Sequence, residues 1–160
     1  MEWEKFAMGK VVVLIEDNLL DEKLTVRALK SAGTEMDVIV LRDGAQALNF
    51  FKGEGECSGG KMSVLPTLVL LDLKLPKVSG LEVLKELRFN LRTRSLQVVV
   101  LTSSIEKEDL IQSYKLGANS YIRKQVDFVR FSESVKKITE YWLGLNECLP
   151  DDMSEKVGTG

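Results

Sequence analysis

Short, continuous runs of apolar residues alternate along the chain with stretches in which apolar residues recur every three or four positions. The runs are of strand length and rich in branched side chains, which is typical of strands buried on both faces. They lie at 10–15, 37–41, 67–71, 96–101 and 119–122. The stretches between them predict helices over 20–32, 43–51, 80–88 and 106–116, and a last helix with an apolar stripe from Phe128 to Trp142.

Strands that alternate with helices predict an α/β fold with one doubly wound, five-stranded parallel sheet, (βα)5. The 160 residues suffice for one domain, which we expect over 10–146. Residues 1–9 form a short N-terminal extension, and the polar stretch 147–160 predicts a disordered tail. The glycine-rich connection 52–65 is long for a loop in a compact domain and indicates an insertion.

The composition limits which binding partners and which cellular compartment we expect for this protein. The net charge of -2 gives no reason to expect nucleic acid or an anionic membrane as a partner. There is no signal-peptide pattern and no apolar run of bilayer length. Cys57 and Cys148 lack metal-ligand spacing, so we expect a protein of the reducing cytoplasm. The absence of histidine excludes histidine-based catalysis, histidine metal ligation and a phosphohistidine on this chain.

Polar residues follow the predicted strands at their carboxyl ends, where open α/β sheets bind their ligands. These residues are Glu16, Asp17, Asp72, Thr102 and Lys124. Carboxylates packed together raise one another's pKa unless a cation neutralises them, and oxygen ligands alone favour Mg²⁺ or Mn²⁺. A hydroxyl and an ammonium group are suited to phosphoryl oxygens. Asp72 would then be the nucleophile, because a carboxylate can accept a phosphoryl group as an acyl phosphate.

Four short motifs at these strand ends give the chain a family resemblance. They are Ile15-Glu-Asp-Asn18, Leu71-Asp-Leu-Lys-Leu-Pro76 followed by Gly80, Leu101-Thr-Ser103, and Tyr121-Ile-Arg-Lys124. Together, in this order and spacing, they resemble the bacterial response-regulator receiver domain of two-component signalling, over residues 10–145. The resemblance implies a CheY-like, flavodoxin-like fold.

The resemblance also implies a signalling protein and not an enzyme that acts on a separate substrate. A partner sensor histidine kinase would phosphorylate Asp72, and the domain itself would catalyse its phosphorylation and dephosphorylation. The divalent metal, Mg²⁺ or Mn²⁺, would be held by Glu16, Asp17, Asp72 and the main-chain carbonyl of Lys74.

Three further residues have roles in the family. Lys124 would contact the phosphoryl group, and Thr102 and Tyr121 would form the switch pair. The sequence departs from the family after the lysine, where Gln125 replaces a proline whose peptide bond is often cis. A cis bond before a residue other than proline costs about 2.5–4 kcal/mol. Either the site tolerates that cost, or the bond is trans and Lys124 is aimed differently.

Two features narrow the resemblance further. The long connection at 52–65 and the ending Glu140-Tyr-Trp-Leu-Gly-Leu-Asn-Glu147 resemble stand-alone regulators that pair with cyanobacterial and bacterial phytochrome kinases. The aromatic and apolar residues of Tyr141–Leu145 indicate an interface, so we expect a homodimer through the last strand, the last helix and this region. We expect no output domain, and therefore signalling through protein contacts.

Other interpretations stay open. Each candidate residue also has a structural role available: Asp72 as a loop cap, Glu16-Asp17 as a helix cap, Thr102 in a turn, Lys124 as a surface charge and Tyr121 in the core. An aspartyl-phosphate phosphohydrolase of the haloacid dehalogenase type would need a second aspartate two residues after the nucleophile, where this chain has a lysine. A receiver domain that works as an adaptor without phosphorylation is the remaining alternative.

Overall fold

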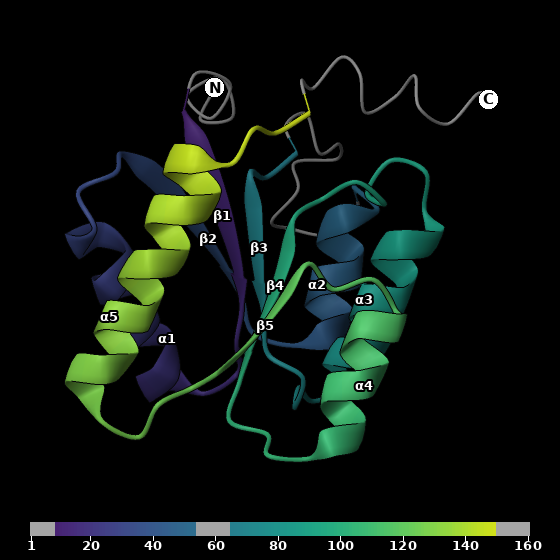
Figure 1. Ribbon diagram of the computed structural model, residues 1–160. Helices are drawn as coiled ribbons and strands as arrows, with labels where there is room; N and C mark the ends of the chain where they lie inside the picture. The colour runs from purple at the N-terminus through teal and green to yellow at the C-terminus, as the bar shows by residue number, and fades with distance from the viewer. Residues whose placement is uncertain (1–8, 54–64, 150–160) are drawn as a thin grey trace.

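The computed structural model describes residues 9–53 and 65–149, and within these ranges five parallel strands form one sheet (Figure 1). The strands are β1 (Lys10–Ile15), β2 (Met36–Leu41), β3 (Leu68–Leu71), β4 (Val98–Thr102) and β5 (Ser120–Arg123). Their order in the sheet is β2-β1-β3-β4-β5. The predicted doubly wound parallel sheet is confirmed. Most of the predicted N-terminal extension, of the connection 52–65 and of the C-terminal tail lies outside the described residues.

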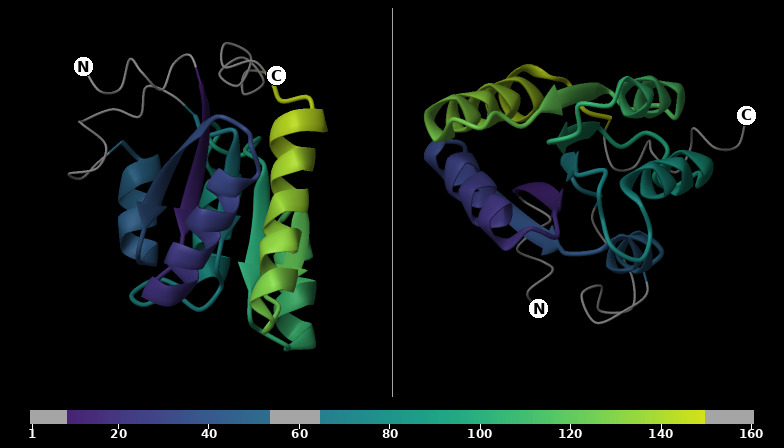
Figure 2. Two further views of the ribbon diagram at one scale, coloured as in Figure 1. Left: turned by 90° about the vertical axis from the view of Figure 1, so that its left-hand side faces the viewer. Right: turned by 90° about the horizontal axis from the view of Figure 1, so that it is seen from below.

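Helices cover both faces of the sheet (Figures 1 and 2). One face is covered by α1 (Leu19–Ser31) and α5 (Phe128–Thr139), and the other by α2 (Gly44–Phe51), α3 (Gly80–Phe89) and α4 (Lys107–Lys115).

Successive residues of a strand point to opposite faces. In β1, Val12 and Leu14 therefore pack with α1 and α5, whereas Val13 and Ile15 pack with α2 and α3. This two-sided burial is the reason that the strands are apolar throughout. Among the described residues, no helix combines the length and the apolar character that a membrane span requires.

Two element boundaries differ from the predictions by more than one residue. The strand predicted at 96–101 begins at Val98 and includes Thr102, because the Leu96 N–H is already used in a turn with the Thr93 carbonyl. The last helix ends at Thr139 and continues as a π-helix, Glu140–Leu145.

The wider turn of the π-helix changes which side chains reach the core. Leu143 is buried, so its assignment to the predicted interface of Tyr141–Leu145 is wrong. The predicted core stripe is wrong at its start, where Phe128 is 44% exposed. The stripe is confirmed further along the helix at Phe131, Val135 and Ile138.

Candidate functional site

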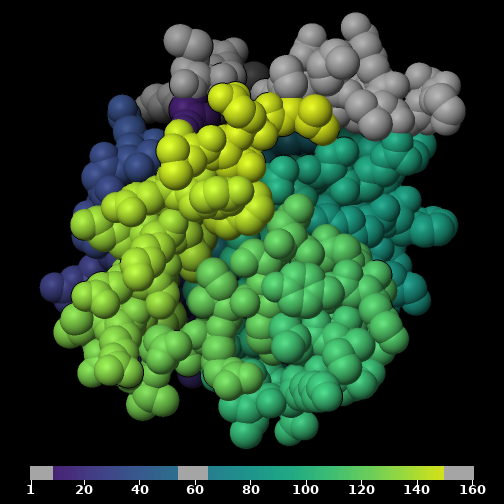
Figure 3. All heavy atoms as spheres, in the orientation of Figure 1, coloured from purple at the N-terminus to yellow at the C-terminus, as the bar shows by residue number. Residues whose placement is uncertain are grey.

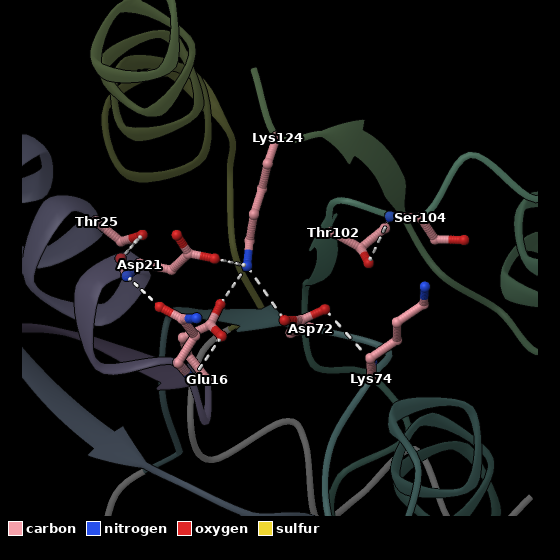
Figure 4. Close-up of polar contacts among 9 residues, drawn as sticks. Glu16, Asp21, Thr25, Asp72, Lys74, Thr102, Ser104 and Lys124 are labelled. Carbon is pink, nitrogen blue, oxygen red and sulfur yellow. Dashed lines mark hydrogen bonds and ion pairs between the residues drawn. The ribbon is translucent and has the colours of Figure 1, made fainter. Parts of the chain in front are cut away.

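Main-chain hydrogen bonds keep the strands paired up to their carboxyl ends, and this pairing gathers the polar residues there. The Asp72 N–H donates to the Ile15 carbonyl at 3.0 Å, and the Lys124 N–H donates to the Thr102 carbonyl at 2.7 Å. The side chains of Glu16, Asp72 and Lys124 therefore meet at the edge of the sheet that the carboxyl ends of the strands form, the carboxyl edge (Figure 4).

The Lys124 ammonium group lies at the centre of this edge. Its Nζ donates to Glu16 Oε2 at 2.5 Å, to Asp21 Oδ2 at 2.9 Å and to Asp72 Oδ2 at 3.1 Å. The lysine side chain is only 7% exposed. No cis peptide bond occurs in the described residues, so the bond from Lys124 to Gln125 is trans. The trans bond does not turn Lys124 away from the site, because its ammonium group reaches Asp72.

Negative charge exceeds positive charge at this edge. Burial, and then the charge of Asp72, raises the pKa of Glu16 to about 7, although Lys124 acts in the opposite direction. Burial alone would lower the pKa of Lys124, but the charges of Asp72 and Glu16 raise it above its ordinary value. One ammonium group thus serves several carboxylates, and the site favours a further cation.

Three carboxylates are placed to hold that cation. Glu16, Asp17 and Asp72 each offer an oxygen within 4.8 Å of the others. Glu16 and Asp72 are buried and Asp17 is exposed. A second hydrogen bond fixes Glu16, whose Oε1 accepts from the Asn18 N–H at 3.1 Å. A set of oxygen ligands open to solvent fits Mg²⁺ or Mn²⁺, which retain waters.

The turn after Asp72 folds back tightly on its neighbours. The Lys74 N–H approaches Asp72 Oδ1 at 3.4 Å, so the main chain of Lys74 lies beside the carboxylate. The Gly80 N–H donates to the Leu73 carbonyl at 2.8 Å. A Cβ on Gly80 would lie only 2.2 Å from the Asp72 carbonyl oxygen, so α3 can begin this close to Asp72 only with glycine. The Pro76 carbonyl also accepts from the Gly44 N–H at 3.3 Å, which links the turn to α2.

Thr102 and Tyr121 lie on the same face of the sheet. Tyr121 pairs with Val100 in the register of β4 and β5, which makes it a diagonal neighbour of Thr102. The Thr102 hydroxyl is fully buried and accepts from the Ser104 N–H at 3.3 Å. Burial raises the pKa of Tyr121, whose hydroxyl is buried without a well-formed hydrogen bond among the described residues. The threonine and the tyrosine are therefore close in the fold without a direct hydrogen bond between them.

Sequence reasoning missed Asp21 and Asp109. Asp21 contacts Lys124, and Asp109 Oδ2 accepts from the Ser104 hydroxyl at 2.5 Å. Both aspartates lie in the first turn of a helix that follows a carboxyl end of the sheet. Asp17 precedes Asn18, the N-cap residue of α1, whereas Asp21 lies within the helix. The signal by which Asp21 could have been found is its place in the first turn of the helix that directly follows the Glu16-Asp17 strand end.

Comparisons with known proteins agree with this geometry. The family model described as response regulator receiver domain matches residues 12–136. Probable methanogenesis regulatory protein FilR2 of Methanothrix harundinacea is 41% identical over 136 residues, which cover 85% of each chain. Response regulator Rcp1 of Synechocystis is 39% identical over 134 residues, which cover 84% of this chain and 89% of Rcp1.

Two solved structures have the same fold. The phosphorylated cyanobacterial phytochrome response regulator RcpA superposes with a TM-score of 0.83 at 36% identity, over 89% of this chain and 99% of RcpA. The Mn²⁺-bound form of Rcp1 superposes with a TM-score of 0.81 at 35% identity, over 88% of this chain and 99% of Rcp1.

Proposed function

The chain belongs to the response regulator receiver domain family, and on this premise we propose that Asp72 accepts a phosphoryl group from a partner sensor histidine kinase. The observation that carries the proposal is the Asp72 carboxylate, whose side chain is only 8% exposed and which lies 3.1 Å from the Lys124 ammonium group at the carboxyl ends of the strands. A buried carboxylate beside a cation, with further acids around it, is equipped to form and stabilise an acyl phosphate.

The transfer makes one bond and breaks one. A carboxylate oxygen of Asp72 attacks the phosphorus of the kinase's phosphohistidine, an O–P bond forms, and the N–P bond breaks. The histidine nitrogen leaves with the bonding electron pair. Lys124 donates hydrogen bonds to the phosphoryl oxygens, which replace part of its contact with the Glu16 carboxylate.

We propose that the metal ligands are Glu16, Asp17, Asp72 and the main-chain carbonyl of Lys74. The support is the set of three carboxylate oxygens within 4.8 Å of one another, together with the Mn²⁺-bound structure of Rcp1. A bound Mg²⁺ or Mn²⁺ would supply positive charge next to the phosphoryl oxygens. In the same scheme the domain itself catalyses the loss of the phosphoryl group to water.

Phosphorylation then acts on Thr102 and Tyr121. The added charge on Asp72 attracts the Thr102 hydroxyl, which at present accepts a hydrogen bond from the Ser104 N–H. Tyr121 follows towards Thr102, because its buried hydroxyl lacks a well-formed hydrogen bond among the described residues. This movement repacks the side of the molecule that α4, β5 and α5 form. Figure 3 shows this side facing the viewer.

We propose that this side forms a homodimer. Large apolar side chains are exposed on α4 and on the π-helix after α5, at Tyr114 (51%), Tyr141 (50%) and Leu145 (75%). The rings of Tyr141 and Trp142 pack edge to face at 4.9 Å, which orders this exposed surface. Size-exclusion chromatography with light scattering tests the proposal. A monomer at micromolar concentrations, both with and without a phosphate mimic, would contradict it.

The partner kinase is proposed to be of the phytochrome type, on the strength of the similarity to Rcp1 and RcpA. The test is phosphotransfer from a radiolabelled phytochrome-type kinase, with an unrelated histidine kinase as the control. Faster transfer from the phytochrome-type kinase supports the pathway. Equal or slower transfer contradicts it without affecting the role of Asp72.

Incubation with acetyl phosphate and Mg²⁺, followed by intact mass measurement, tests the central proposal. The wild type should gain one phosphoryl group, which hydroxylamine removes because the adduct is an acyl phosphate. Asp72→Asn should gain none, and Asp37→Asn, which changes an exposed aspartate on β2, should behave as the wild type. An unmodified wild type, or an equal adduct on Asp72→Asn, would favour the adaptor function that needs no phosphorylation.

A further inference from the structure

Asp21 is the one partner of the Lys124 ammonium group that lies outside the three-carboxylate set, as far as the described residues show. Its Oδ2 accepts from Lys124 Nζ at 2.9 Å, a distance between those of the Glu16 and Asp72 contacts. In Figure 4, Asp21 and Asp72 lie on opposite sides of the lysine. The ammonium group is thus shared between the proposed metal ligands and a carboxylate on α1.

The first turn of α1 holds Asp21 in place. Asn18 Oδ1 accepts from the Asp21 N–H at 3.0 Å, and the Thr25 hydroxyl donates to the Asp21 carbonyl at 2.7 Å. The main chain of Asn18 also donates to Glu16. Asn18 therefore contacts both the Glu16 carboxylate and the main chain of Asp21, two of the residues that share Lys124. The contact between Asp21 and Lys124 is part of a connected network, in contrast to an isolated surface ion pair.

The position of the ammonium group matters for the metal. Two of the three acceptors of Lys124, Glu16 and Asp72, are proposed ligands, so the ammonium group and a divalent ion compete for the same oxygens. A negative charge on the side of the lysine opposite Asp72 attracts the ammonium group away from these oxygens and so offsets part of the competition. Asp21 supplies that charge, with a side chain 34% exposed and therefore only moderately desolvated.

We propose that Asp21 is a positioning residue for Lys124, which draws the ammonium group towards α1 and so favours divalent metal binding at Glu16 and Asp72. This inference rests on the proposed metal site and goes beyond it by naming a residue that is not a ligand. Without the Asp21 charge, the ammonium group is neutralised less and repels the incoming ion more strongly.

A double-mutant cycle with Mn²⁺ alone tests the inference. Free Mn²⁺ is measured by electron paramagnetic resonance for the wild type, Asp21→Asn, Lys124→Met and the double variant, all at one pH. Asp21→Asn should weaken Mn²⁺ binding by about two- to fivefold in the wild type, the range for a partly exposed ion pair. In the Lys124→Met background the same change should have clearly less effect, because the ammonium group through which Asp21 acts is absent.

Matched controls separate the possible causes. Glu106→Gln removes the same charge from an exposed residue in the loop between β4 and α4, and it should leave the affinity unchanged. Asp21→Asn keeps the main-chain N–H that Asn18 caps, and thermal unfolding of each variant confirms its folded state. A wild type that binds no Mn²⁺ would overturn the proposed metal site itself. Equal effects of Asp21→Asn in both backgrounds, no effect in the wild type, or an equal effect of Glu106→Gln would overturn only the role of Asp21.

Discussion

Gly80 is the position at which a single methyl group should disturb both the fold and the candidate site. Gly80→Ala places a Cβ 2.2 Å from the Asp72 carbonyl oxygen and 2.6 Å from the Leu73 Cα, where contacts below 3.0 Å essentially never occur. The neighbouring atoms are main chain, so they cannot rotate away as a side chain would. The start of α3 and the turn after Asp72 must therefore move apart, which stretches the hydrogen bond from the Gly80 N–H to the Leu73 carbonyl.

Two opposing effects determine how far Gly80→Ala changes the free energy of unfolding. Overpacking of this kind costs about 1–3 kcal/mol. Alanine in place of glycine in a helix returns up to about 1 kcal/mol, and less than that in the first turn. We therefore expect Gly80→Ala to lower the free energy of unfolding by roughly 1–2 kcal/mol. Gly144→Ala is the matched control, because no atom lies within 4 Å of its added Cβ, and it should be neutral or stabilising by about 0.5–1 kcal/mol.

Urea unfolding gives the stability, and the rate of phosphorylation by acetyl phosphate reports on Asp72. The unfolding midpoint of Gly80→Ala should fall by about 0.5–1 M urea at an unchanged slope. Its phosphorylation should also be slower, because Asp72 shares the displaced main chain, whereas Gly144→Ala should be phosphorylated at the wild-type rate. A Gly80→Ala protein that matches the wild type in both assays would refute the reasoning that the close approach positions Asp72.

Three further predictions concern residues outside the immediate site. Asp43→Ala should cost about 1 kcal/mol of stability, because Asp43 Oδ1 accepts from the Gln46 N–H at the start of α2. This hydrogen bond lowers the pKa of Asp43 in the folded state, so the Asp43 charge contributes stability at neutral pH that is lost as the pH falls through the folded pKa. In acid titrations followed by circular dichroism, the stabilities of the wild type and of Asp43→Asn should therefore converge at low pH. Arg88→Met should lower stability by about 2–3 kcal/mol in urea unfolding, because the guanidinium donates to three main-chain carbonyls and to the Asn119 side chain; a loss below about 0.5 kcal/mol would contradict this. Glu22→Gln should destabilise the protein more than Glu35→Gln does in the same assay. Buried Glu22 accepts two hydrogen bonds from the Arg42 guanidinium, whereas Glu35 is exposed.

Much of the fold follows from local pattern. A parallel sheet buries both faces of its strands, so each strand appears as an unbroken apolar run, and the residue after each run marks the carboxyl edge. That reasoning places Glu16, Asp72 and Lys124 at one edge, where their side chains meet in the structure. The proposed roles of these residues follow from the family resemblance and await the experiments above.

Other features depend on contacts that a linear pattern does not contain. Asp21 lies in an ordinary first turn, and its contact with Lys124 spans 103 residues of sequence. The change from α-helix to π-helix after Thr139 alters the angular spacing of the side chains, and a stripe drawn at α-helical spacing therefore misassigns Leu143. Gln125 left the direction of Lys124 open between two alternatives, because the pairing of β5 with β4, which the sequence does not show, places the lysine.

The order of the strands gives the site unequal mobility. β1 and β3, which carry the acids, each have a hydrogen-bonded strand on both sides, whereas β5, which carries Lys124, is an edge strand bonded only to β4. Edge strands open at lower free energy than interior strands, so amide hydrogens of β5 should exchange sooner than those of β1 and β3. Glu16 and Asp72 are then held by the interior strands, whereas Lys124 can shift between its carboxylate acceptors without unfolding of the sheet.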